Sequence, residues 1–215
     1  MQLCKFNIRP DTIVNGGLKK GRYIVWLNLN VVEANAQDDT LEPFESFTDR
    51  LILSNHDITS FLEAVDEKHI AIATNDEIMA IMQYFKVESD IQSWKAIRQL
   101  QIKGYDQTEN VNKFYLIGQP LWLDKATRVG LVNSISAEKR SGCLLTDLWF
   151  GNTMIQLPVD EALSKLDQIE LYAKECYNVT AKHIADVEQT DSIQELQEYD
   201  ITLDYPSFLE LNIIE

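Results

Sequence analysis

Mostly small or apolar side chains recur every three or four residues between residues 159 and 189, and this repeat constrains the fold most strongly. The positions are Ala162, Leu166, Ile169, Ala173, Cys176, Thr180, His183 and Val187. Such spacing lines one narrow stripe of an α-helix. At 1.5 Å per residue, a helix from Val159 to Gln189 is about 45 Å long. The pattern therefore predicts a long helix packed lengthwise on another helix or on a sheet.

The first 53 residues have the composition of β-strands. The segments CKFNI, GRYIVWLNLNVV and FTDRLIL alternate in polarity or are rich in β-branched and aromatic residues. Gly16-Gly17 and Lys20-Gly21 favour turns because glycine tolerates positive φ. We therefore expect about three antiparallel strands, with a loop near residues 33–46.

Helical patterns with recognisable ends follow. Residues 58–65 form a short amphipathic helix. Thr74 and Glu77 have the spacing of a capping box, in which two side chains satisfy the free amides at the start of a helix. Ser89 is suited to cap a third helix, and Gly104 is placed to end it.

Two β-hairpins alternate with helices in the remainder of the chain. Gly118-Gln119 and Gly151-Asn152 are the expected hairpin turns. Asp124 is expected to cap a helix over residues 125–140, and Gly142 to stop it. A short helix after residues 190–192 and a final strand complete the order α-ββ-α-ββ-α-α-β. The sequence thus predicts an α+β protein with a β-rich N-terminal region at 1–90 and a second module at 91–215.

Charge and hydropathy exclude several classes of function. The net charge of −15 disfavours nucleic acid as a partner, because phosphate binding needs a basic surface. No apolar run is long enough to span a membrane, and the N-terminus resembles no secretory signal. Residues 94–158 hold eight Lys and Arg against five Asp and Glu, whereas residues 159–215 hold three against fourteen. The acidic helix either packs beside the basic segment or meets a basic partner protein.

No catalytic, cofactor-binding or metal-binding pattern is present in the sequence. The three histidines have no metal-ligand spacing, and the three cysteines are distant from one another. Lys125 is expected to lie in the first turn of a capped helix rather than to act as a nucleophile. His183 and Cys176 are expected to be structural, and the four tryptophans to anchor the core.

Residues 94–208 resemble an uncharacterised domain family of Bacteroidetes and their phages and prophages. The resemblance is carried by YDQTENVNKFYLIGQPLWLDKATR, TDLWFGNTMIQLP, ELYAKECYNVT and LQEYDITLDYP. The matching residues include Tyr105, Asp106, Trp122, Asp124, Arg128, Trp149, Tyr199 and Asp200. Ile201 and Asp204 replace residues of the family's closing pattern, which affects the expected geometry of that turn. The family looks tail-associated or tail-fibre-associated, and the resemblance supplies no catalytic residue.

The resemblance implies a non-enzymatic structural protein of a bacteriophage virion, such as a tail or tail-fibre adaptor, hub or collar. It would be made in the host cytoplasm and bind other tail proteins as a homo-oligomer, with neither nucleic acid nor membrane as partner. One alternative is a tail-associated glycan hydrolase using Asp106, Asp124 and Asp200. Another is an assembly chaperone outside the particle. If the protein is structural, Asp106 and Arg128 are expected to have internal roles in which they tie a turn to a helix.

Overall fold

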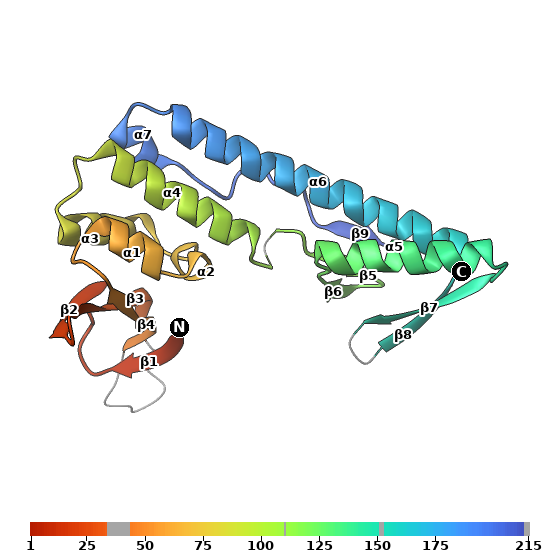
Figure 1. The fold of residues 1–215 in the computed structure, drawn as a ribbon, viewed down its shortest axis with the longest axis horizontal. Helices are drawn as coiled ribbons and strands as arrows, with labels where there is room; N and C mark the ends of the chain where they lie inside the picture. The colour runs from red at the N-terminus through yellow and green to blue at the C-terminus, as the bar shows by residue number, and fades with distance from the viewer. Residues whose placement is uncertain (34–43, 110, 151–152, 213–215) are drawn as a thin grey trace. The chain divides into compact units, whose positions relative to one another are not determined.

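The computed structural model describes residues 1–33, 44–109, 111–150 and 153–212 and has the predicted α+β fold (Figure 1). The chain forms two compact units. Unit 1 contains residues 1–107 and 182–203, and unit 2 contains residues 108–181 and 204–215. The bounds of these units differ from the predicted ranges 1–90 and 91–215. The reason is that helices later in the chain complete the core of the N-terminal region.

Unit 1 begins with a four-stranded antiparallel sheet in the order β1-β4-β3-β2. The strands are β1 (Gln2–Phe6), β2 (Ile13–Lys19), β3 (Arg22–Glu33) and β4 (Phe44–Leu53). Three were predicted, and β2 was missed because Gly16-Gly17 was interpreted as a turn. These glycines instead lie in β2, at a register shift between Asn15 and Gly17. Lys20-Gly21 is the predicted turn, with positive φ at both residues. Most of the expected loop at residues 33–46 lies outside the described residues.

Four helices follow the sheet in unit 1, and three of them were predicted. They are α1 (Ile58–Ala64), α2 (Glu67–Ile70), α3 (Asn75–Phe85) and α4 (Ile91–Asp106). The capping box at Thr74 and Glu77 is confirmed. The cap of α4 is Asp90 rather than Ser89, because the Asp90 carboxylate accepts hydrogen bonds from the amides of Gln92 and Ser93. Side chains of the sheet and of the helices share one apolar core.

Gly104 does not end α4, contrary to prediction. The helix continues to Asp106, and Gly104 lies where α4 packs against α2. A Cβ atom at this position would lie 1.7 Å from the backbone oxygen of Glu67. Glycine is therefore needed here for the close approach of two backbones rather than for a left-handed cap.

The end of the long helix α6 (Val159–Gln189) and the short helix α7 (Ile193–Glu198) complete unit 1. Arg98 of α4 is buried and donates hydrogen bonds to the backbone oxygens of Leu196 and Gln197 at 2.7 and 2.8 Å. Lys95 donates to the backbone oxygen of Glu188 at 2.6 Å. Two cations of α4 thus bind the terminal carbonyl groups of these helices, where the helix dipole is negative.

Unit 2 contains a three-stranded sheet, a hairpin and two helices. The sheet has the order β6-β5-β9, from β5 (Phe114–Leu116), β6 (Gln119–Leu121) and β9 (Leu209–Leu211). The hairpin is formed by β7 (Leu145–Phe150) and β8 (Thr153–Pro158), and helix α5 is Lys125–Arg140. The first turn is Ile117-Gly118, one residue before the prediction, with positive φ at both residues. The second predicted turn, Gly151-Asn152, lies outside the described residues.

Helix α6 spans residues 159–189 as predicted, and all eight predicted stripe residues are buried. Its first half packs in the core of unit 2 with α5, β7 and β8. Its last turns belong to unit 1. The helix ends of α5 were also predicted correctly: Asp124 caps its start, and Gly142 follows its last turn with φ +83°. Within the described ranges, no helix combines the length and apolar composition needed to cross a bilayer.

Candidate functional site

Two Tyr-Asp pairs of the predicted motif lie in unit 1, and the structure brings them together. Tyr105 is half-buried in α4, and Asp106 is the last residue of that helix. Burial raises the pKa of the Tyr105 hydroxyl, and the negative charge of Asp200 raises it further. Residues about a hundred positions apart in sequence are therefore neighbours in the fold.

His183 is a buried structural histidine in this same region, as predicted. Its Nε2 lies 2.9 Å from the backbone oxygen of Leu203, and its Nδ1 lies 2.7 Å from the hydroxyl of Tyr199. Because a carbonyl oxygen only accepts, Nε2 carries the proton and donates it. In the neutral ring Nδ1 then accepts from Tyr199. Both ring nitrogens of His183 are thereby engaged in tying α6 to residues 199–203.

The motif residues of unit 2 support the start of α5. Asp124 accepts hydrogen bonds from the Thr127 backbone amide at 2.9 Å and from the Thr127 hydroxyl at 2.6 Å. Arg128 donates to the backbone oxygen of Leu123 at 2.6 Å and pairs with Glu170 at 2.8 Å. Arg128 thus ties the turn before α5 to the helix and α5 to α6, which is the structural role expected of it.

Two of the three carboxyl groups considered for glycoside hydrolysis, those of Asp124 and Asp200, act as local hydrogen-bond acceptors. Hydrogen bonds from Thr127 lower the pKa of Asp124, and hydrogen bonds from Thr202 lower that of Asp200. A glycosidase acid needs a pKa that is raised. None of Asp106, Asp124 and Asp200 lines either pocket described below. Among the described residues, no cluster of three or more His, Cys, Asp or Glu could hold a metal ion.

Three of the four tryptophans are exposed, which contradicts the prediction that they anchor the core. Trp94 is fully buried, but Trp26 is 39%, Trp122 is 50% and Trp149 is 66% exposed. Phe114 of β5 is fully buried, whereas Trp122, the residue after β6, is not. Aromatic side chains that a chain leaves in water are frequent in protein interfaces. The exposed tryptophans are therefore candidate contact residues.

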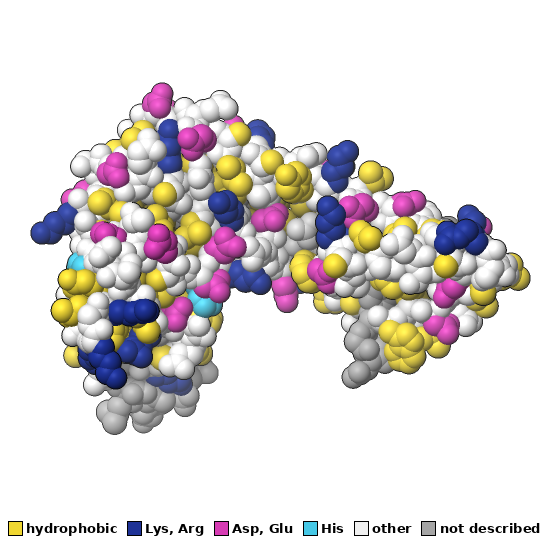
Figure 2. Space-filling view, in the orientation of Figure 1, with side chains coloured by type: hydrophobic (Ala, Val, Ile, Leu, Met, Phe, Trp, Pro, Cys, Tyr) yellow, Lys and Arg dark blue, Asp and Glu magenta, His cyan; other side chains and the backbone are white. Residues whose placement is uncertain are grey.

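The hairpin β7–β8 presents its outer face to solvent. Trp149 pairs across the strands with Met154, and Leu145 with Pro158. Leu145, Trp149 and Met154 are all exposed, whereas Leu148 and Leu157 on the other face are buried. Hydrophobic side chains are visible on this hairpin in Figure 2. Among the described residues the two strands pair only with each other, so each has an edge that another strand could join.

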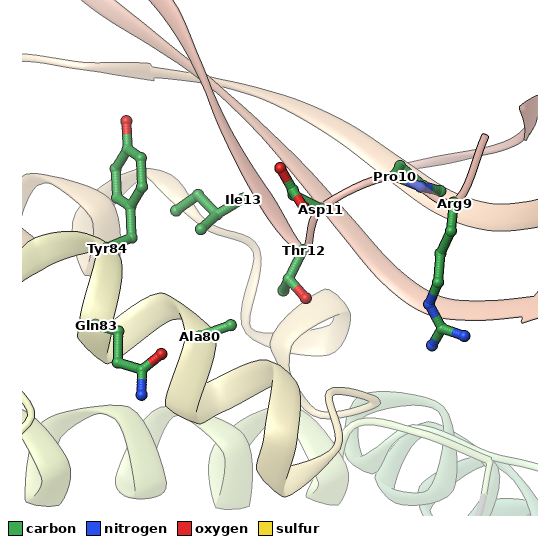
Figure 3. Close-up of a pocket in the computed structure, with 8 residues that line it drawn as sticks. All are labelled: Arg9, Pro10, Asp11, Thr12, Ile13, Ala80, Gln83 and Tyr84. Carbon is green, nitrogen blue, oxygen red and sulfur yellow. The ribbon is translucent and has the colours of Figure 1, made fainter.

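A pocket of about 530 Å³ lies between the β1–β2 loop and α3 in unit 1 (Figure 3). Its lining residues are Arg9, Pro10, Asp11, Thr12, Ile13, Ala80, Gln83 and Tyr84. A second pocket of about 390 Å³ shares Arg9, Pro10 and Thr12 and continues past Asp76 and Glu77. Asn28 holds the loop, because its amide donates to the backbone oxygen of Thr12 and its side chain to that of Asp11.

The pocket offers a polar surface rather than a set of reacting groups. Glu77 accepts hydrogen bonds from the amides of Asn30 and Thr74, so its carboxylate is already used by the fold. The hydroxyl of Tyr84 lies 2.8 Å from Nε2 of His56, and burial raises the pKa of Tyr84. Arg9 and Asp11 are exposed at the rim. Sequence reasoning missed this pocket, because its loop precedes the strand β2 that was not predicted.

Comparison of the chain with protein-family models, with curated proteins and with solved structures found no match.

Proposed function

We propose that the protein is a non-enzymatic structural component of a bacteriophage tail that acts through protein–protein assembly. The observation that carries this proposal is the exposed face of β7–β8, where the apolar side chains of Leu145, Trp149 and Met154 flank the hydrogen-bonded pair of Asp147 and Gln156. Covering such a face is favourable by about 25 cal/mol per Å² of apolar surface removed from water. A two-stranded hairpin on its own is also only marginally stable.

A partner strand that joins the hairpin would gain backbone hydrogen bonds as well as apolar contact. Only one face of β7–β8 packs on the core of unit 2, and no other strand in the described part of the chain pairs with either edge. This is the arrangement expected of a protein that completes its sheet on assembly with a neighbour. The partners we propose are other tail proteins and further copies of this chain.

The resemblance of residues 94–208 connects this assembly role to a bacteriophage. A tail or tail-fibre adaptor, hub or collar uses repeated contacts between copies and neighbours, usually with closed symmetry. The protein would be made in the host cytoplasm and would remain in the finished virion. No step in this role requires a catalytic group, and the role uses surfaces rather than the pocket.

Mass spectrometry of purified particles tests the proposal. Particles made by the genome that encodes this chain should contain the protein in a fixed ratio to a known tail protein. If the protein accumulates in the infected cell but is missing from purified particles, the structural role is wrong. That outcome would favour the assembly chaperone instead.

A point variant tests the surface itself. Trp149→Ser should reduce incorporation into particles at least tenfold, because it removes the largest apolar side chain of the exposed face. Tyr177→Ser is the matched control, since Tyr177 is 67% exposed on α6, away from the hairpin. Equal incorporation of both variants would contradict the assignment of this face.

A further inference from the structure

The outer face of the N-terminal sheet combines apolar and basic side chains, which we call the basic sheet patch. It consists of Val14, Lys19, Arg22, Trp26, Arg50 and Ile52. Strand pairing places Val14, Trp26 and Arg50 in one row across β2, β3 and β4. Ile24 and Ile52 form the next row, and Lys19 and Arg22 the third. Alternate residues of a strand face the same side, so these rows share one face.

The side chains around the margin of this face are exposed, although Ile24 in its middle row is buried, and the opposite face of the sheet is in the core. Val25, Leu27 and Leu51 point inward and are almost fully buried. Val14, Trp26 and Ile52 are 38%, 39% and 47% exposed. Lys19, Arg22 and Arg50 are exposed too. Within the described strands these three rows contain no Asp or Glu, so the charged side chains of the rows are all cations.

The opposite charge is concentrated elsewhere in unit 1. Residues 183–203 contain six Asp and Glu and no Lys or Arg. Four of these acids are exposed around the end of α6 and on α7: Glu188, Asp191, Glu195 and Glu198. We call these four residues the acidic end. The nearest cations of α4, Lys95 and Arg98, are buried and bind backbone oxygens.

The two charged surfaces lie on opposite sides of unit 1. Helix α7 packs on α4, α4 packs on α1 and α2, and α1 packs on β4. Figure 1 shows the sheet and α7 at opposite ends of this unit, and Figure 2 shows Lys and Arg side chains gathered at the sheet end. The basic sheet patch therefore cannot reach the acidic end of its own unit, although it can reach that of another molecule.

We propose that the basic sheet patch docks on the acidic end of a second copy of this chain, so that copies associate head to tail. Complementary charge orients the two surfaces, and Trp26, Val14 and Ile52 lose water on contact. A head-to-tail contact uses two different surfaces of each copy, so it closes into a ring or continues as a filament. This inference names one partner for the assembly role proposed above, and its test does not depend on the protein entering a particle.

A single-stranded nucleic acid is the other class that an exposed tryptophan among cations could bind. The acidic surface of another copy is favoured over it. The chain carries a net charge of −15, so a polyanion that extends beyond the patch meets repulsion from the remainder of the molecule. A protein surface with a local cluster of carboxylates contacts only the basic sheet patch and so avoids this repulsion.

Charge reversal tests the contact in solution. Sedimentation velocity of the full chain should show association in about 50 mM NaCl that weakens at least tenfold in about 500 mM, because salt screens exposed charges. Arg22→Glu with Arg50→Glu should weaken association more than tenfold in low salt. Glu195→Lys with Glu198→Lys should do the same. The four changes combined should restore association, because both surfaces then carry inverted charge.

The controls distinguish this contact from other associations. Lys103→Glu reverses an exposed charge of α4 outside both surfaces and should leave association unchanged. Circular dichroism should report the same fold for every variant. The proposal is overturned if the wild-type chain stays monomeric in low salt, if neither double variant weakens association, or if the combined variant is not restored. It is also overturned if a monomeric wild-type chain binds a fluorescent oligothymidylate and the Arg22→Glu, Arg50→Glu variant does not.

Discussion

Arg98 shows at the level of one residue how unit 1 closes. Its guanidinium is buried and donates to the backbone oxygens of Leu196 and Gln197 and to the side-chain oxygens of Gln101 and Asn75. All four acceptors are neutral. Burial lowers the pKa of Arg98 to about 10, which leaves it charged at neutral pH. One side chain thus joins α4 to α3 and α7 at the cost of desolvating a cation.

The cap of α4 gives a prediction that depends on pH. Asp90→Ala should lower the free energy of unfolding by about 1 kcal/mol at pH 7, the usual loss for an N-cap. Hydrogen bonds from Ser93 hold the pKa of Asp90 below its ordinary value. Because the folded pKa is lowered, this stabilisation is present above the unfolded pKa of an aspartate and is lost as the pH falls through the folded pKa. Urea unfolding of both proteins at neutral and acidic pH measures the difference, which should shrink in acid.

Ser89→Ala is the matched control for this cap, since Ser89 is the neighbouring residue with equal capping ability. It is exposed, and the helix starts after Asp90. The Ser89 variant should differ from the wild type by less than about 0.5 kcal/mol. A larger loss for Ser89→Ala than for Asp90→Ala would place the cap one residue earlier.

Two glycines in helices have opposite roles at the level of the elements. Gly104→Ala should lower the free energy of unfolding by about 3 kcal/mol, because its methyl group would overlap the backbone of α2. Gly130 lies in α5 with no atom within 4 Å of an added Cβ. Gly130→Ala should therefore raise stability by about 0.5–1 kcal/mol through helix propensity. Thermal unfolding and urea titration measure the change for both variants. A loss of stability in Gly130→Ala would show that the role given to Gly130 is wrong.

Elements were predictable from sequence where periodicity or caps specify them. The stripe of α6 repeats over the whole helix, so each residue supports the same conclusion. Thr74 and Glu77 likewise fix the start of α3 by chemistry within four residues. Gly104 could not be interpreted this way, because a glycine that ends a helix and a glycine that admits another backbone look alike in sequence. The same ambiguity concealed β2, where two glycines form a bulge.

In the whole molecule, unit 1 and unit 2 have separate cores. We therefore expect a core mutation in one unit to destabilise the elements of that unit alone. Ile97 is fully buried in the core of unit 1, and Leu166 is nearly so in the core of unit 2. Replacing either residue with Ala should destabilise by about 2–5 kcal/mol. Hydrogen exchange should accelerate in β3, β4 and α4 for Ile97→Ala, and in α5, β7 and β8 for Leu166→Ala. Equal acceleration in all of these elements for either variant would contradict independent cores.

The candidate surfaces were less predictable than the cores. Trp26 and Trp149 have the residue type and strand context of core anchors, and only the paired strands reveal that they face outward. A single sequence shows that a side chain is apolar. Which residues bury that side chain depends on long-range strand pairing and on binding partners. The proximity of Tyr105 to Asp200 was hidden for the same reason.

Both units are discontinuous in the chain, which has a consequence for synthesis. Unit 1 needs residues 182–203, and β9 joins the sheet of unit 2 only at residues 209–211. A ribosome that has translated the first 107 residues has therefore made the sheet and four helices of unit 1 without the α7 segment that Arg98 holds. Neither unit can close as a nascent chain until translation passes α7. A premature stop codon within α6 should thus prevent both units from folding. Chaperones would then bind a chain in which the cores of both units are incomplete.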